Sequence, residues 1–145
     1  MRLVLDTNVL VAALRSDSGA SRQLLIGALD REFEVLASVP LMLEYEAVLT
    51  RTEHLEASGL TAKQVNEVLD ALAKMLTPVP LRFLWRPRLK DPGDEMVLAT
   101  AVNGGADRLV TFNVRHLAAA SREFGIRALK PGDVWKEVRR RNEKE

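Results

Sequence analysis

The chain has 145 residues, 47% hydrophobic and 28% charged, a formal net charge of +1 and no cysteine, values typical of one globular domain over residues 1–145. This composition excludes disulfides, thiol nucleophiles and thiolate zinc sites, and leaves any affinity for nucleic acid to local patches. No apolar run approaches the ~20 residues of a membrane span, and Asp6 interrupts the first run too early for a signal segment, so we expect a cytoplasmic protein without a membrane partner.

The first third of the chain alternates strand and helix patterns. Residues 2–5 are continuous, aliphatic and bounded by polar residues, which predicts a short buried strand. Helical patterns follow at 9–14 and 20–31, separated by a polar break that contains a glycine. A second strand is expected at 33–37. A proline near the first helical position then opens a helix over 40–51.

The middle of the chain contains the clearest helical pattern. Over residues 61–76 apolar side chains recur every three or four positions, and two prolines end the pattern. Residues 81–89 are predicted to be extended. A helix is expected at 94–103, where two glycines stop it, and a strand follows at 108–112.

The last elements predict a helix at 114–124, a strand at 126–129 and a helix at 133–141. We interpret the basic residues 139–141 as the solvated end of this helix, within a charged tail that covers about residues 136–145. Strands that alternate with helices predict a three-layer α/β/α domain with a mostly parallel central sheet of about four to five strands.

Polar residues interrupt the first apolar stretch directly after its strand, at Asp6-Thr7-Asn8. In an open parallel sheet, ligands bind outside the carboxyl ends of the strands, so Asp6 is a candidate site residue. The alternative is that Asp6 or Asn8 caps the next helix, since both residue types do this well.

A second acidic group lies in "KDPGDEMVLATAV". Pro92 suits the first helical position with Asp91 as N-cap, which leaves Asp94 in the first turn. Helical spacing puts Asp94 near the middle of an apolar stripe formed by Val97, Leu98, Ala101 and Val102. A carboxylate there is costly unless it is paired or binds a metal.

The segment "PLMLEYEAVLTR" offers two glutamates, and periodicity does not choose between them. Glu44 and Glu46 flank the apolar stripe at nearly equal angles on opposite sides. Either faces a crevice or is an ordinary surface residue.

The segment "RLVTFNVRHL" repeats the opening pattern, with Thr111 and Asn113 at the end of an apolar strand. A site role and a helix-cap role are both open for Asn113, and the two are compatible.

Together these motifs resemble the PIN-domain nucleases, and in particular the bacterial and archaeal toxin components related to the VapC toxins. The resemblance covers nearly the whole chain, from residue 2 to about residue 135, and is strongest in "LDTNVL", "DPGDEMVLATA" and "LVTFN". It implies catalytic roles for Asp6, Glu44, Asp94 and Asn113. It implies supporting roles for Thr7, Asn8, Asp91 and Thr111. Glu44 is preferred to Glu46 on this ground alone.

The resemblance also implies that Asp6, Glu44 and Asp94 bind metal. Three carboxylates in one crevice raise one another's pKa, a divalent cation relieves the repulsion, and oxygen ligands suit Mg²⁺ or Mn²⁺. Such an ion activates water and stabilises phosphate charge in an in-line displacement, with a 5′-phosphate and a 3′-hydroxyl as the products expected by analogy. Many family members carry Asp where this chain has Asn113. The sequence therefore does not decide whether the site binds one metal ion or two.

The segment "LRFLWRPRLK" is the candidate for RNA contact. If it is extended, one side carries a row of cations that leads into the acidic residues: Arg82, Arg86, Arg88 and Lys90. The other side then buries Phe83, Trp85 and Leu89. Such a row suits a phosphate backbone, and an edge strand protected by basic residues explains the same pattern.

The function implied by the resemblance is a divalent-metal-dependent endoribonuclease that acts as the toxin of a type II toxin–antitoxin pair. Its partners would be an RNA substrate, a cognate antitoxin protein and a second copy of the chain in a homodimer. One alternative is a catalytically silent RNA-binding or interaction module, which Asn113 keeps open. A weaker one is a phosphatase of the haloacid dehalogenase type, which needs a second Asp where this chain has Asn8. We interpret His116 as a surface or helix-turn histidine.

Overall fold

The sheet of this protein has five strands in the order β3-β2-β1-β4-β5, and every neighbouring pair is parallel. The structure is a computed structural model that describes residues 1–83, 85 and 87–144. The strands are β1 (Arg2–Leu5), β2 (Glu34–Ala37), β3 (Leu76–Pro78), β4 (Arg108–Val110) and β5 (Arg127–Leu129). The predicted α/β fold with a mostly parallel central sheet is confirmed.

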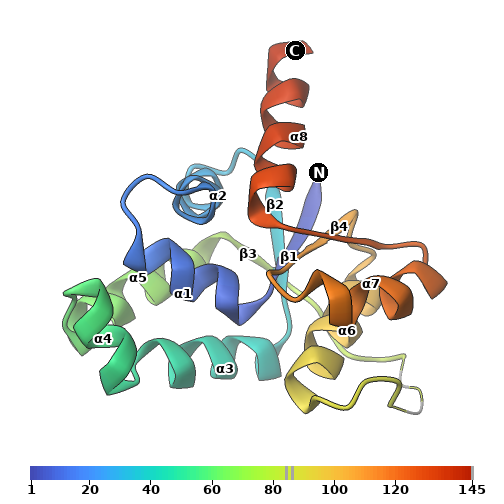
Figure 1. Cartoon of the computed structure of the whole chain (residues 1–145), viewed down its shortest axis with the longest axis horizontal. Coiled ribbons are helices and arrows are strands. Elements are labelled where there is room, and N and C mark those ends of the chain that lie inside the picture. The colour runs from blue at the N-terminus through green and yellow to red at the C-terminus, as the bar shows by residue number, and fades with distance from the viewer. Residues whose placement is uncertain (84, 86, 145) are drawn as a thin grey trace.

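Helices cover both faces of this sheet (Figure 1). They are α1 (Thr7–Arg15), α2 (Ala20–Leu29), α3 (Val39–Leu49), α4 (Thr52–Ser58), α5 (Ala62–Met75), α6 (Pro92–Gly104), α7 (Val114–Glu123) and α8 (Pro131–Lys144). In Figure 1, α1 to α5 lie to the left of the central strands and pack on one another, whereas α6 and α7 lie to the right. Helix α6 packs on β1, β2 and β4, so it covers the middle of the sheet.

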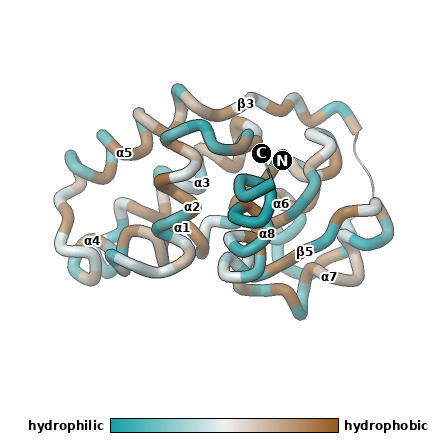
Figure 2. Tube along the Cα trace, turned by 90° about the horizontal axis from the view of Figure 1, so that it is seen from above, coloured by the Kyte–Doolittle hydropathy of each residue, from teal (hydrophilic) through white to brown (hydrophobic). Residues whose placement is uncertain are grey.

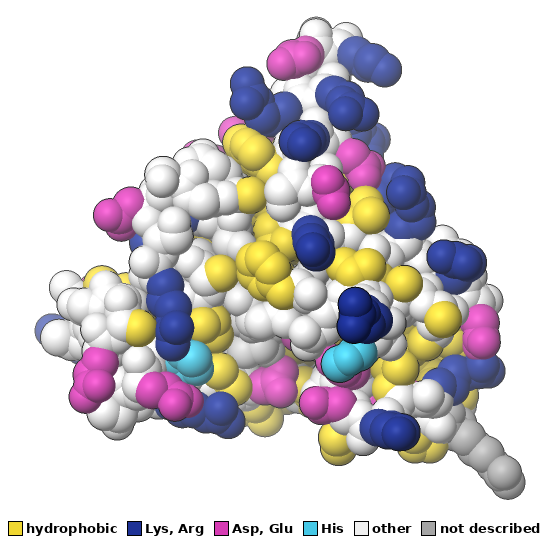
Figure 3. All heavy atoms as spheres, in the orientation of Figure 1, with side chains coloured by type: hydrophobic (Ala, Val, Ile, Leu, Met, Phe, Trp, Pro, Cys, Tyr) yellow, Lys and Arg dark blue, Asp and Glu magenta, His cyan; other side chains and the backbone are white. Residues whose placement is uncertain are grey.

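The last helix, α8, contacts α2 and β4 at its beginning and then projects away from the body (Figure 1). Seen from above, it is hydrophilic along much of its length (Figure 2). Basic side chains gather on it in Figure 3, and Arg139, Arg140 and Arg141 are exposed, as predicted. None of the helices in the described part of the chain combines the length and hydrophobicity needed to cross a membrane.

The core is centred on β1 and β4, whose apolar residues are buried almost completely. Strands covered by helices on both faces are expected to be continuously apolar, and β1 fits this rule. Leu5 is paired with Val110, so the carboxyl ends of β1 and β4 lie side by side. After β1 the chain adds β2 and β3 on one side of it, and then crosses to add β4 and β5 on the other side. The carboxyl ends of β1 and β4 therefore form the switch point, which is where open parallel sheets bind ligands. Asp6 and Thr111 follow directly from these two strand ends.

Local structure differs from the sequence predictions in three places. Helix α4 was not predicted, because none of its residues is buried and its sequence shows no apolar stripe. The helix predicted over 61–76 ends at Met75, and residues 76–78 form the edge strand β3, which was not predicted; proline is compatible with an edge strand because it lacks only a donor. Residues 81–89, predicted to be extended, form no strand in the part that the structure describes.

Candidate active site

Asp6 is fixed at the end of β1 by two hydrogen bonds. Its Oδ1 accepts the Thr7 backbone N–H at 2.8 Å, and its Oδ2 accepts the Thr111 hydroxyl at 2.7 Å. Asp6 is the N-cap of α1 and only 7% exposed. The capping role and a site role therefore coexist, as a side chain that caps α1 also lies at the switch point of the sheet.

Glu44 lies beside Asp6, because Thr7 joins the two acids. The Thr7 hydroxyl donates to Glu44 Oε2 at 2.5 Å, while the Thr7 N–H holds Asp6. The neighbouring Tyr45 is fully buried, and its hydroxyl donates to the carbonyl of Leu5, the last residue of β1. This bond ties α3 to the strand end that carries Asp6. Tyr45 belongs to the apolar stripe of α3, and periodicity alone does not indicate the role of its hydroxyl.

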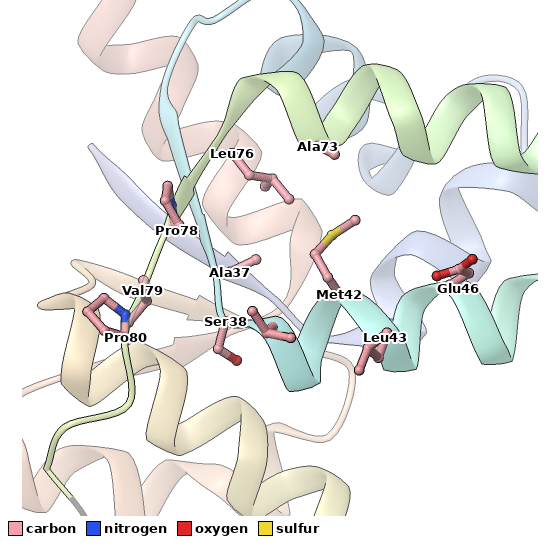
Figure 4. Close-up of a pocket in the computed structure, with 11 residues that line it drawn as sticks. Ala37, Ser38, Met42, Leu43, Glu46, Ala73, Leu76, Pro78, Val79 and Pro80 are labelled. Carbon is pink, nitrogen blue, oxygen red and sulfur yellow. The ribbon is translucent and has the colours of Figure 1, made fainter.

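Glu46 lies elsewhere. It lines an apolar groove together with Met42 and Leu43 of α3 and residues from β3, as Figure 4 shows. Periodicity did not decide which of the two glutamates lies near Asp6. In the structure Glu44 lies next to Asp6, and Glu46 faces a different surface.

Asp94 is carried to the same place by the first turn of α6. Asp91 is the N-cap and accepts the Gly93 N–H at 2.7 Å, and Pro92 occupies the first turn as predicted. Asp94 is only 7% exposed, in agreement with its place in the apolar stripe. A Cβ on Gly93 would lie 3.1 Å from Asp91 Oδ1 and 3.2 Å from Glu44 Oε1, so glycine permits the close approach of α3 and α6.

The pKa values show that these carboxylates act on one another. Burial raises the pKa of Asp6 from 3.8 to about 6, against the hydrogen bonds from Thr111 and Thr7 that lower it, and the charges of Asp94 and Glu44 raise it further. Burial also raises the pKa of Asp94, with further increases from the charges of Asp91 and Glu44. Figure 3 shows acidic side chains at the lower centre, where α3 and α6 approach each other. The acids predicted from three distant segments thus share one site.

His116 lies near the acids, which the interpretation of it as a surface or helix-turn histidine did not include. It is exposed, yet its charge lowers the pKa of Asp94. The reason is its position in the first turn of α7, directly after the end of β4, where its N–H bonds to the Asn113 carbonyl at 3.0 Å. A histidine three residues after a strand-end asparagine is the pattern that indicates this placement.

Thr111 is fully buried and organises the end of β4. Its hydroxyl donates to Asp6 and accepts the Asn113 N–H at 2.9 Å. Asn8 also reaches this strand end, since its Oδ1 accepts the Phe112 N–H at 3.3 Å. Asn113 is exposed and occupies the N-cap position of α7, but its side chain makes no capping hydrogen bond. The side-chain amide of Asn113 therefore stays at the rim of the site.

Two polar residues outside the predicted set hold α3 and α6 together. Ser38 caps α3 by accepting the Leu41 N–H, and its hydroxyl shares a hydrogen bond of 2.7 Å with the Thr100 hydroxyl on α6. Both side chains are buried. A serine two positions before Pro40 is a recognisable N-cap pattern, but its partner on α6 is 62 residues away and no sequence pattern indicates it.

The donor set fits a hard divalent cation in its chemistry, because all candidate ligands are oxygens. Among the described residues, however, no three acidic or histidine side chains already surround a common point at ligand distance. Thr7 and Thr111 also occupy oxygens of Asp6 and Glu44. Mg²⁺ keeps several waters and is commonly held by one or two carboxylates, so this arrangement is compatible with it.

The predicted row of cations is not formed as expected. Phe83, predicted to be buried, is 54% exposed. Arg88 is engaged elsewhere, since it pairs with Glu123 and lies 5.3 Å from the centre of the Phe124 ring. Arg82 and Lys90 are exposed, and Arg86 lies outside the described residues.

A comparison with known protein families finds one agreement. A family model described as "PIN domain" matches residues 2–115, a span that includes all four predicted catalytic residues, Asp6, Glu44, Asp94 and Asn113. No curated protein matches the chain. The matched span covers well over half of the sequence, so the chain belongs to the PIN-domain family, whose members are typically nucleases and generally use divalent metals.

Proposed function

We propose that this protein is a Mg²⁺- or Mn²⁺-dependent endoribonuclease whose ion is held by Asp6, Glu44 and Asp94. The observation that carries the proposal is the buried carboxylate of Asp6, with its pKa raised to about 6, beside two further acids at the switch point of the sheet. Buried acids that raise one another's pKa are costly to the fold, and such clusters are typical of functional sites.

The chain's own residues have separate tasks in this proposal. Thr7 and Thr111 fix the carboxylates of Asp6 and Glu44, so the ligands are oriented before an ion binds. When bound, the ion supplies charge neutralisation at the phosphate and activation of water. Asn113 and His116 are exposed beside the acids, and the N–H groups of their side chains suit the oxygens of the substrate phosphate.

The proposed substrate, partner and biological role are supported by exposed basic residues and by the resemblance. Arg82 and Lys90 are exposed on the segment that leads to Asp91, which suits a phosphate backbone. The resemblance to the VapC toxins supports a toxin role, an antitoxin partner and a homodimer. In that role, expression of the parent chain in a bacterial host should arrest growth, and expression of Asp6→Asn should not.

The test of the chemistry is cleavage of single-stranded and structured RNAs by the purified protein, with Mn²⁺ or with chelator. Asp6→Asn removes a charge at the buried site, so we expect the rate to fall by at least about a hundredfold. The exposed Asp17 provides a matched control, and Asp17→Asn should cleave like the parent. Cleavage that persists in chelator or in Asp6→Asn would disprove the metal mechanism. If no RNA is cleaved, a catalytically silent PIN module becomes the better explanation.

A further inference from the structure

The segment between β3 and α6 is irregular, yet two side chains of α6 fix its backbone. Asn103 Oδ1 accepts the N–H groups of Arg82 and Phe83 at 3.0 and 2.6 Å, and its Nδ2 donates to the Phe83 carbonyl at 3.0 Å. Nearer the start of α6, Glu95 accepts the N–H groups of Arg88 and Leu89. The Asn103 side chain therefore holds the backbone of Arg82 and Phe83 by three hydrogen bonds, two of them to Phe83.

This anchored backbone presents aromatic side chains. The Phe83 ring is 54% exposed and lies 5.4 Å from Trp85, measured between ring centres. The ring centre of Trp85 in turn lies 4.8 Å from that of Phe124, the residue that follows α7. Exposed aromatic rings held in a fixed orientation are the usual means by which proteins stack the bases of single-stranded nucleic acids.

Phe83 and Trp85 line a hollow of about 330 Å³ between α3 and α6. Its other lining residues are mostly apolar: Pro40, Leu81, Pro92, Glu95, Met96 and Ala99. This volume is at the lower end of the range of small-molecule sites, which suits one planar ring system rather than a large ligand. Because the lining is apolar apart from Glu95, it favours a base over a phosphate.

The hollow adjoins the acidic site. Pro40 precedes Glu44 by four residues on α3, so both lie on the same face of that helix, about 6 Å apart along its axis. On α6, Pro92 and Glu95 line the hollow and flank Asp94 in the same turn. A nucleotide whose phosphate lies at the acids would therefore place an adjacent base within reach of the hollow.

We propose that this hollow binds one unstacked base of single-stranded RNA next to the phosphate that is cleaved, with Phe83 and Trp85 as the stacking surface. The inference rests on the proposed ribonuclease function and adds to it a subsite for one base. A base in a duplex is already stacked and paired, so the hollow selects single strands or loops. Arg82 and Lys90 are exposed on the same segment and suit the flanking phosphates.

The test uses the fluorescence of Trp85. The chain has two tryptophans, Trp85 and Trp135, so Trp135→Phe leaves Trp85 as the reporter. This variant is titrated in chelator with a short single-stranded RNA, with the matching duplex, and with inorganic polyphosphate, which carries charge but no base. Single-stranded RNA should quench Trp85, and Phe83→Ala should weaken its binding by about tenfold. Binding of polyphosphate should not depend on Phe83.

Two variants serve as controls. Phe83→Tyr keeps the ring and should bind like the parent. Leu43→Ala removes an apolar side chain that is 60% exposed in the neighbouring groove, outside the hollow, and should also bind like the parent. Circular dichroism of each variant establishes that it is folded.

The possible results separate the two proposals. If cleavage requires Mn²⁺ and Asp6 but Phe83→Ala binds RNA like the parent, the base site is wrong and the nuclease stands. If RNA quenches Trp85 but no RNA is cleaved, the base site stands and the nuclease is wrong. If no RNA binds in chelator or with Mn²⁺, both are wrong. A change in sedimentation mass on Phe83→Ala, with RNA affinity unaltered, would show that the hollow is a protein interface and overturn the base site.

Discussion

The acidic site and the aromatic hollow are neighbours, but they are built in opposite ways. At the acidic site Asp6 directly follows a strand end, Asp94 lies in the first turn of α6 and Glu44 in the second turn of α3, and buried hydroxyls hold two of these carboxylates. In the hollow the aromatic residues lie on an irregular segment whose backbone is held by side chains from α6. The acids are thus carried by a strand end and by helices, whereas the aromatic residues lie outside any helix or strand and depend on side-chain hydrogen bonds for their position. Substitutions should therefore separate chemistry at the acids from selection of substrate at the hollow.

The largest expected effect lies at the acidic site, in the contrast between Glu44 and Glu46. Glu44→Gln keeps an oxygen that can accept the Thr7 hydroxyl but removes the charge beside Asp6, so we expect Mn²⁺-dependent cleavage to fall by about a hundredfold. Glu46→Gln is the matched control on the same helix, and it should cleave within about twofold of the parent because it lines the apolar groove. If only Glu46→Gln lost activity, the assignment of Glu44 as the metal ligand would be wrong.

This contrast also marks how far the sequence leads. Asp6 and Asp94 were predictable from local rules, because one follows a buried strand and the other interrupts an apolar helical stripe. Glu44 was not, because periodicity balanced it against Glu46, and its place depends on Thr7 and on the bond from Tyr45 to β1.

The hollow was less predictable still. The alternation of basic and apolar residues over 81–89 predicted that Phe83 is buried. That prediction holds only if the segment is straight and extended, so that alternate side chains point to opposite sides. The backbone bonds instead to Asn103 and Glu95, and no pattern within the segment itself indicates these partners. Most of the strands and helices were predictable, because they depend on local apolar periodicity; α4 and β3, which lack a clear apolar pattern, were not.

The second prediction concerns the pH dependence of stability in metal-free buffer. Asp6 has a pKa of about 6 in the folded protein and 3.8 as its ordinary value, so between these values the folded state binds the proton more tightly. The contribution of Asp6 to the free energy of unfolding is therefore present below about pH 4 and is lost as the pH rises through 6. The shift of about two pKa units corresponds to at most about 3 kcal/mol.

Urea unfolding in chelator, from pH 5 to pH 8, measures this effect. Asp6→Asn lacks the titrating group, so it should be more stable than the parent by roughly 1–3 kcal/mol at pH 8, with a smaller difference at pH 5. Acids that lie away from this site titrate alike in both proteins and cancel in the comparison. Excess Mn²⁺ should stabilise the parent and not the variant, because only the ionised site binds the ion. An equal difference at both ends of the range would mean that Asp6 is not the group responsible.

The smallest expected effect tests the hollow through Asn103, which touches no substrate in our proposal and acts by positioning Phe83. Asn103→Ala removes three hydrogen bonds to the backbone of Arg82 and Phe83, so we expect a loss of about 1 kcal/mol in stability and a decrease of a few-fold in affinity for single-stranded RNA. Asn103→Asp keeps the acceptor for both N–H groups and should retain most of the affinity. Asn142→Ala, at an exposed position on α8, is the control for loss of an asparagine from a helix surface.

A double-mutant cycle distinguishes positioning from general destabilisation. If Asn103 acts on RNA only through Phe83, then Asn103→Ala should cause no further loss of RNA affinity in a protein that already carries Phe83→Ala. The loss of stability caused by Asn103→Ala should be the same with and without Phe83→Ala. The affinity for Mn²⁺ should be unchanged in every member of the cycle, since the acids are held by Thr7, Thr111 and the first turn of α6. Additive losses of RNA affinity, or a loss of Mn²⁺ affinity, would show that the two regions are not independent, and that α6 transmits changes in the hollow to the acidic site.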